Sequence, residues 1–170
     1  YHLRVNEGRK FHELNKVDFS KSIPATEIDS KLKGLKWITP PFKDNVEEEI
    51  NFIKDLKSQI QTDKRKKMVI THYSFISSIL DENFFSPSMA YTSDGSIIPL
   101  KNNKYSQKYK NLVINLIKKN NVDVIYIVYP VHKGSIADYL DKSCLKEKLI
   151  LKGVISYEIK RCKDLIGKNN

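Results

Sequence analysis

The sequence predicts an α/β fold: a three-layer sandwich with a mainly parallel central sheet and an antiparallel C-terminal edge. Apolar runs typical of buried strands alternate along the chain with segments in which apolar residues recur at helical spacing. The last two predicted strands follow each other directly, separated by a tight turn at Gly153. Right-handed crossovers between the parallel strands would place helices on both faces of the sheet.

The N-terminal part of the chain carries the weakest pattern. Residues 1–34 are polar, and we expect a short helix near residues 8–16 and then loop, packed on a single domain of residues 35–165. Residues 35–39 read Leu-Lys-Trp-Ile-Thr, a β-rich run that the two following prolines stop because proline cannot donate a ladder hydrogen bond. This run predicts the first strand.

The clearest helix is predicted over residues 45–61. Asp44 and Glu47 have the spacing of a capping box, and apolar residues follow at helical intervals as far as Ile60. The next apolar run predicts a strand over residues 67–72, buried on both faces, and a short helix follows it over residues 75–80.

Turn-forming residues dominate residues 84–103, which predict a long irregular insertion of the kind that often carries function. After it, we expect a second amphipathic helix over residues 105–120 and the most β-rich strand over residues 122–129. A small helix and two strands complete the predicted fold, near residues 135–140, at 149–151 and at 154–159.

The chain is basic, with 30 Lys and Arg against 20 Asp and Glu and a formal net charge of +10. We nevertheless predict no nucleic-acid partner, because 26 of the 30 cations are Lys, spread along the whole chain, whereas base and phosphate recognition favours the planar fork of Arg. Lys, Ile and Asn share AT-rich codons, so a low-GC genome accounts for this composition. The basic run at residues 64–67 is expected to be a solvated loop before a strand.

No apolar run approaches the roughly 18 residues of a membrane-spanning helix, so we expect these residues not to cross a membrane. The sequence begins with Tyr1 rather than Met, and nothing near it resembles a signal peptide. We therefore expect the chain to be a piece of a longer protein.

The predicted binding site follows from the sheet, because open α/β sheets bind ligands outside the carboxyl ends of their strands. The aromatic Tyr91 belongs to the insertion that would lie above those ends and offers a platform for a sugar or lipid head group. The residues predicted at the strand ends are Thr71, His72, Tyr73, Ser74, Tyr129 and His132.

Two histidines at these ends, His72 and His132, invite an acid/base or metal-binding interpretation. No third ligand with suitable spacing accompanies them, so we predict no metal and favour a role in the loops. Ser74 beside His72 lacks the flanking glycines of a nucleophile elbow. The six glycines are isolated, so no phosphate-binding loop or dinucleotide fingerprint exists, and we predict no cofactor.

Three stretches resemble a known family: residues 32–39, residues 67–76, and the segment Lys104 to Lys110 with the later strand at residues 124–126. They are similar to the soluble C-terminal domains of bacterial polytopic membrane proteins related to the dolichyl-phosphate-mannose-type glycosyltransferases of the C superfamily. In that family a lipid-linked sugar is used at the outer face of the membrane, and the catalytic carboxylates lie in loops between membrane helices. Those loops are absent from this sequence, so no catalytic residue is carried over.

The resemblance implies an accessory domain at the extracytoplasmic (periplasmic) face, joined to a transmembrane portion of its own polypeptide and helping to recognise an acceptor or a lipid-linked sugar. We expect this chain to have no turnover of its own, because the sequence shows no clear nucleophile–base pair, metal-ligand set or phosphate loop. In that oxidising compartment Cys144 and Cys162 are expected to form a disulfide. The alternative for the cysteines is two reduced, buried thiols.

Two other functions stay open from the sequence. One is a free-standing soluble α/β enzyme, hydrolase-like, that uses His72, Ser74 and His132. The other is a structural or partner-binding module with no small ligand.

Overall fold

The computed structural model describes the following residues: 18–38, 45–88, 98–99, 102–131, 136 and 138–160. Residue contacts divide the chain into two units, of which unit 1 comprises residues 1–62 and unit 2 comprises residues 63–170. The sequence predicted one domain over residues 35–165 with residues 1–34 packed on it, and that organisation stays a prediction. We describe each unit by itself.

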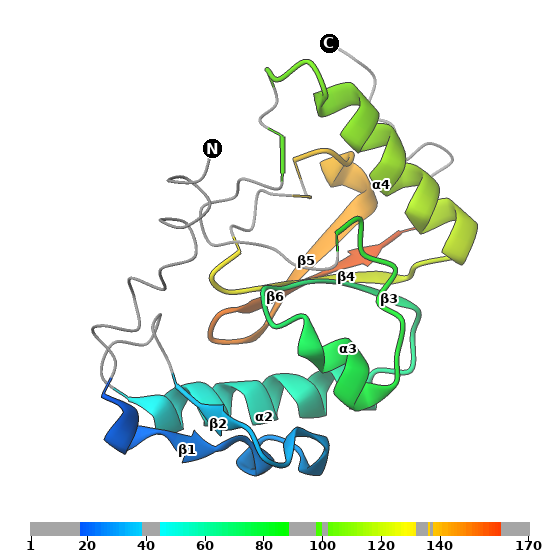
Figure 1. Ribbon diagram of the computed structural model, residues 1–170. Helices are drawn as coiled ribbons and strands as arrows, with labels where there is room; N and C mark the ends of the chain where they lie inside the picture. Colours follow the sequence, from blue (N-terminus) through cyan, green and yellow to red (C-terminus); the bar gives the residue numbers. More distant parts are fainter. Residues whose placement is uncertain are drawn as a thin grey trace, which may run out of the picture. The chain divides into compact units, whose positions relative to one another are not determined.

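Unit 1 combines a small ladder with one long helix (Figure 1). Strand β1 (Ile23–Pro24) pairs antiparallel with β2 (Lys36–Trp37), flanked by the 3₁₀ turns η2 (Phe19–Lys21), η3 (Ala25–Glu27) and η4 (Ser30–Leu32). The predicted first strand is thus real but short, and its partner lies in a segment that the sequence suggested was loop. The predicted helix near residues 8–16 falls outside the described residues.

The helix of unit 1 is α2 (Val46–Thr62), within one residue of its predicted bounds. It begins where Asn45 Oδ1 accepts hydrogen bonds from the amides of Glu47 and Glu48, at 3.0 and 3.4 Å. Asn45 therefore caps this helix, and the predicted Asp44 lies outside the described residues. Its buried apolar residues recur at helical spacing: Ile50, Ile53, Leu56 and Ile60.

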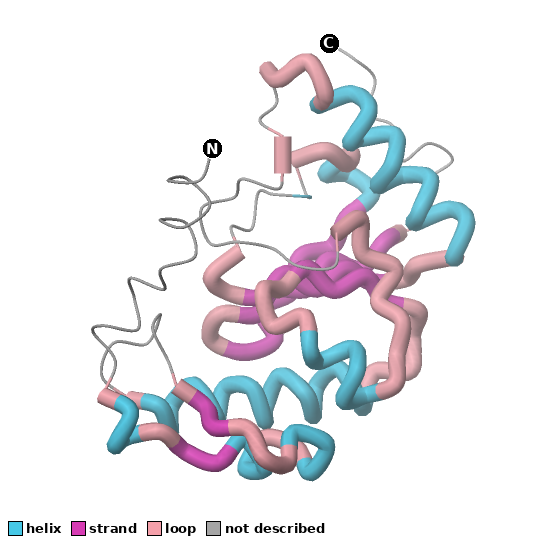
Figure 2. The backbone as a smooth tube through the Cα atoms, viewed as in Figure 1, coloured by secondary structure: helices cyan, strands magenta, loops and turns pink. Residues whose placement is uncertain are grey.

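Unit 2 is built on a four-stranded sheet in the order β3-β4-β6-β5 (Figure 2). Its strands are β3 (Lys67–Ile70), β4 (Val124–Val128), β5 (Leu145–Leu151) and β6 (Val154–Ile159). Strands β3 and β4 are parallel, while β4 with β6 and β6 with β5 are antiparallel.

The α/β class and the antiparallel C-terminal edge are confirmed, but the expectation of a mainly parallel sheet is wrong for the described strands. Only one of the three strand pairings is parallel. The reason is tertiary: the predicted first strand pairs inside unit 1, and the hairpin β5–β6 brings an antiparallel neighbour to β4. Strand β5 also begins at Leu145, four residues before its predicted start at 149.

The core of unit 2 lies between the sheet and α4 (Ser106–Asn120). Alternate residues of neighbouring strands share this face in register, because Met68 pairs with Ile125 and Ile125 pairs with Tyr157. From α4, the residues Val113, Ile114 and Ile117 pack against them. The short helix α3 (Phe75–Leu80) lies on the other side of the sheet (Figure 1).

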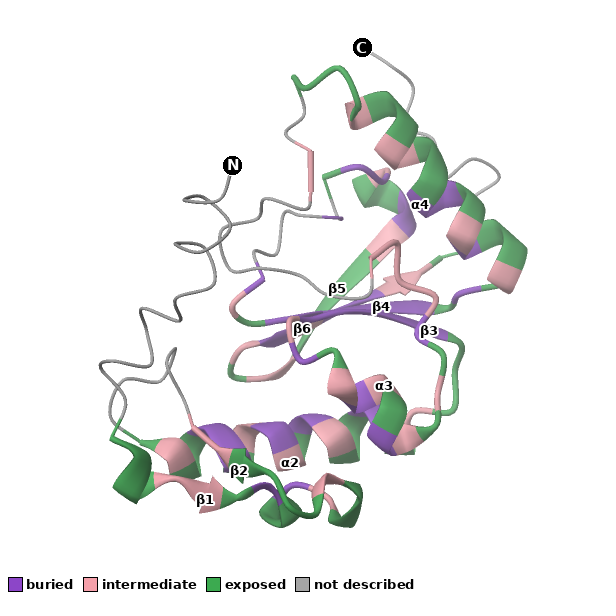
Figure 3. Ribbon diagram, viewed as in Figure 1, coloured by how far each residue is buried: buried purple, intermediate pink, exposed green. Residues whose placement is uncertain are grey.

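Figure 3 shows how unevenly the sheet of unit 2 is covered: β3 and β4 are buried along their whole length, whereas the middle of the edge strand β5 is exposed. Cys144 is buried in the core and takes part in a disulfide. Cys162, the other cysteine of the sequence, lies outside the described residues, so the pairing of these two stays a prediction. None of the helices in the described ranges is long and apolar enough to span a bilayer.

Candidate functional site

A pocket of about 390 Å³ opens beside β3 in unit 2, within the size range of small-molecule sites. Three successive segments form its walls: the end of β3, the helix α3, and the loop of residues 81–88. The described residues that line it are Val69, Thr71, Ser74, Ser77, Ser78, Asp81, Glu82, Asn83, Phe84, Phe85, Ser86 and Ser88.

The loop is held against the outer edge of β3 by a hydrogen bond that replaces a missing strand neighbour. Strand β3 lies at the edge of its sheet, and the Ser86 hydroxyl donates to the Val69 carbonyl at 2.6 Å. This bond satisfies a carbonyl that a further strand would otherwise pair. The edge of β3 is therefore built into the pocket wall.

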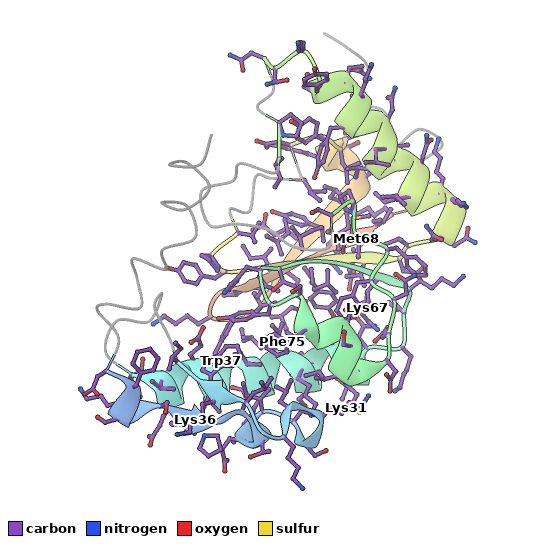
Figure 4. All side chains as sticks on the ribbon, in the orientation of Figure 1. Lys31, Lys36, Trp37, Lys67, Met68 and Phe75 are labelled. Carbon is purple, nitrogen blue, oxygen red and sulfur yellow. The ribbon has the colours of Figure 1, made fainter. Side chains whose placement is uncertain are left out.

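A buried ion pair fixes the middle of the same loop. The Lys67 ammonium pairs with the Glu82 carboxylate, and the side chain of Lys67 is only 2% exposed against 33% for Glu82. Lys67 and Met68 are labelled in Figure 4, and being neighbours on a strand they point to opposite faces of the sheet. The basic run at residues 64–67 is thus not simply a solvated loop, because its last lysine is buried and anchors Glu82 at the pocket.

Two pocket residues have backbone conformations that side chains rarely adopt. Asp81 has φ +52° where it ends α3, and Phe85 has φ +49°. Asp tolerates this left-handed region, but for a bulky residue such as Phe it is an outlier. The Asn83 Oδ1 accepts a hydrogen bond from the Phe85 amide at 3.0 Å, which supports the turn. Strained residues of this kind concentrate at ligand sites.

The pocket offers the chemistry of polyol recognition. Serine hydroxyls both donate and accept hydrogen bonds, the Asn83 amide does the same, and the Asp81 carboxylate accepts, while the Glu82 carboxylate is paired with Lys67. The rings of Phe84 and Phe85 add apolar surface beside these polar groups. Hydroxyls, one amide, carboxylates and aromatic rings together suit a neutral ligand rich in hydroxyl groups better than an anion.

The structure places the predicted site residues in different environments. Thr71 and Ser74 line the pocket. Tyr73 is buried, and its amide donates a hydrogen bond to Thr71 Oγ1 at 3.0 Å. The centre of its ring lies 3.8 Å from that of His72 and 6.1 Å from that of Phe75. His72 and Tyr73 are not among the residues that line the pocket.

Tyr129 follows β4 and is 53% exposed, with its amide donating to the Gly153 carbonyl at 2.7 Å. Strands β3 and β4 pair in parallel, so their carboxyl ends share one edge of the sheet. Tyr91 and His132 fall outside the described residues. Among the described residues no group of three His, Cys, Asp or Glu side chains could hold a metal ion.

The sequence interpretation missed the part of the pocket that follows α3. It placed no site residue between the helix predicted at residues 75–80 and the insertion that begins at residue 84. The sequence did contain a signal for this part of the pocket. Three polar residues lie between the predicted short helix and two aromatic residues, and together they supply the polar and the apolar groups that a binding pocket needs.

A second polar cluster in unit 2 is structural. Burial raises the pKa of Asp63, but hydrogen bonds from Arg65 and Tyr126 outweigh it and lower the pKa to about 2. The Arg65 guanidinium also reaches Glu158 at 3.1 Å. Burial, followed by the hydrogen bond to Asp63, raises the pKa of Tyr126 to about 12. These contacts join the segment before β3 to β4 and β6.

Comparison with protein-family models, curated proteins and solved structures found no match to this chain.

Proposed function

We propose that this chain is an accessory recognition domain that binds a sugar, or the sugar part of a lipid-linked donor, for a membrane-bound glycosyltransferase-like protein. The pocket beside β3 carries the proposal, because its hydroxyls, amide, carboxylates and aromatic rings match the surface of a neutral sugar. The family resemblance of the sequence supplies the glycosyltransferase context.

The extracytoplasmic location belongs to the same proposal. The disulfide at Cys144 supports it, because disulfides persist in oxidising compartments and are rare in reducing ones. We also propose the three-layer arrangement for unit 2, supported by α4 on one face of its sheet and α3 on the other.

Sugar binding is tested by titrating the 170-residue chain with methyl glycosides of mannose, glucose and galactose while backbone amide NMR shifts are followed. We expect shifts at Ser77, Asp81 and Phe85 and none along the exposed side of α2. The variant Asp81→Asn keeps a residue that tolerates φ +52° but removes a charged acceptor, so we expect binding about tenfold weaker. The exposed Asp55→Asn in α2 is the matched control and should bind like the unaltered chain.

Shifts that avoid the pocket for every sugar would contradict the proposal, as would equal weakening by the control. A sugar phosphate that binds much more tightly than the neutral glycoside would also contradict it, because Asp81 adds negative charge to the pocket and Glu82 is already paired with Lys67.

The accessory role has a separate test. The chain is incubated with nitrophenyl esters, phosphates and glycosides, and we expect no turnover above the uncatalysed rate. A rate that is removed by His72→Ala or Ser74→Ala would overturn the accessory role and favour the hydrolase alternative.

A further inference from the structure

The exposed side of α4 carries positive charge without any negative charge. Between Asp94 and Asp123 the sequence has six lysines and no carboxylate. Helix α4 lies within this stretch, with no acidic residue in its first turn and two lysines in its last. We call the exposed lysines of α4, together with the exposed Lys104 two residues before it, the lysine face: Lys104, Lys108, Lys118 and Lys119.

The lysine face lies opposite the side of α4 that packs on the sheet. At 3.6 residues per turn, Lys108, Leu112 and Lys119 share one face of the helix, whereas Val113 and Ile117 are buried on the other. Figure 3 shows this division along α4, with exposed residues on its outer side. A helix of this length spans about 22 Å, so the lysines are spread along a flat strip rather than gathered at one point.

The lysine face has no ion-pair partner within the part of the chain that the structure describes. The ion pairs found there use other cations, such as Lys54, Lys57 and Lys67. The ammonium of Lys104 lies over the ring of Tyr105, 4.9 Å from the ring centre. Four positive charges therefore face outward together.

Neither codon bias nor helix stability accounts for this strip. Helix α2 arises under the same codon bias, yet it carries Glu47, Glu48, Glu49 and Asp55 beside its two lysines. Lys108 lies in the first turn of α4, where the helix dipole disfavours a cation. The charge pattern thus has a cause outside the helix itself.

We propose that the lysine face of α4 lies against a membrane surface that contains anionic lipids. Lipid phosphates complement a flat strip of ammonium groups, each of which adds affinity near an anionic surface. Leu112 and Tyr105 on the same outer side are 44% and 53% exposed, and both suit the boundary between head groups and acyl chains. Nucleic acid fits less well, because none of the four arginines of the chain is in α4.

This inference does not depend on the sugar pocket, which lies on β3, α3 and the loop after it. A failure of sugar binding leaves the membrane contact untouched, and a failure of the membrane contact leaves the pocket untouched.

The test is co-sedimentation of the 170-residue chain with vesicles of phosphatidylcholine that contain about 30% phosphatidylglycerol, against vesicles of phosphatidylcholine alone. We expect binding to the anionic vesicles only, weakening as salt rises from about 0.05 M to about 0.5 M. The double variant Lys108→Gln/Lys119→Gln should bind roughly 25-fold more weakly, because one lysine contributes about fivefold.

Two further variants separate charge from fold. Lys108→Arg/Lys119→Arg keeps the charge and should bind like the unaltered chain. Lys33→Gln/Lys36→Gln removes the same charge from unit 1 and should lower binding about twofold or less, as a change of net charge alone would. Circular dichroism confirms that each variant is folded.

Three results would overturn the proposal: equal binding to both vesicle types, equal weakening by the unit 1 control, or no vesicle binding while the chain binds single-stranded RNA through the same lysines. The last result would assign the lysine face to nucleic acid instead.

Discussion

The helices α2 and α4 bury their apolar residues in the same way but differ on their exposed sides. Each presents a stripe at helical spacing, with Leu56 and Ile117 among the buried residues. The charges of α2 are of both signs, and within unit 1 they have partners: Lys57 pairs with Asp29, and Trp37 Nε1 donates to Glu49 at 2.9 Å. The charged residues on the exposed side of α4 are all lysines.

The difference teaches that burial and surface charge are set independently in this chain. The apolar spacing alone is enough to place each helix. The charges that are used inside a unit are matched by a partner, whereas those on α4 face outward without one in the described residues. Charged side chains that form no ion pair within the described residues are the ones that an external partner most readily explains.

The largest effect we expect tests the feature that α2 and α4 share, which is the burial of their apolar residues. Leu56→Ala and Ile117→Ala each create a cavity and should lower the free energy of unfolding by about 2 to 5 kcal/mol, measured by urea denaturation. Leu112→Ala, on the exposed side of α4, is the control and should cost under about 1 kcal/mol. A loss of less than about 1 kcal/mol of unfolding free energy at either buried position would show that the two helices do not bury their apolar residues in the same way.

A buried ion pair of unit 2 should contribute more to stability than an exposed ion pair of unit 1. Glu82→Gln leaves the buried Lys67 ammonium without its carboxylate and should cost about 3 kcal/mol. Glu27→Gln removes the exposed Lys54–Glu27 pair of unit 1 and should cost under about 1 kcal/mol. The double variant Lys67→Met/Glu82→Gln should recover most of the loss, and no recovery would show that Glu82 acts in some other way.

Asp63 should contribute to the pH dependence of stability in the acid range. The pKa of Asp63 is lowered from 3.8 to about 2, so its stabilisation is present above pH 3.8 and is lost as the pH falls toward 2. Asp63→Asn should cost about 2 kcal/mol near neutral pH and flatten the stability profile in that window. A profile that stays equally steep in Asp63→Asn would refute the assignment.

The smallest effect concerns the lysine face itself. Lys108→Glu places an acid in the first turn of α4 and should stabilise the chain by about 0.5 kcal/mol or less, while Lys118→Glu in the last turn should destabilise it by a similar amount. Thermal unfolding at low salt measures both. A clear loss of stability in Lys108→Glu would mean that this lysine supports the fold and would weaken the contrast with α2.

The sequence by itself determined the elements whose signal is local. Periodic apolar residues placed α2 and α4 closely, and continuous apolar runs placed β3 and β4, because burial on one or both faces leaves a pattern in neighbouring residues. The α/β class follows from the same patterns. Thr71 and Ser74 were predicted because strand ends are positions that a local pattern locates.

Only the tertiary structure decided which strands pair and what surrounds each side chain. The segment at Lys36–Trp37 pairs with Ile23–Pro24, and β6 lies between β4 and β5, because pairing depends on contacts between residues far apart in sequence. The same holds for the pocket: Lys67 reads as one more cation of a basic run until the fold buries it against Glu82. Burial changes the energy of a charge more than its neighbours in sequence do, and burial is a property of the folded chain.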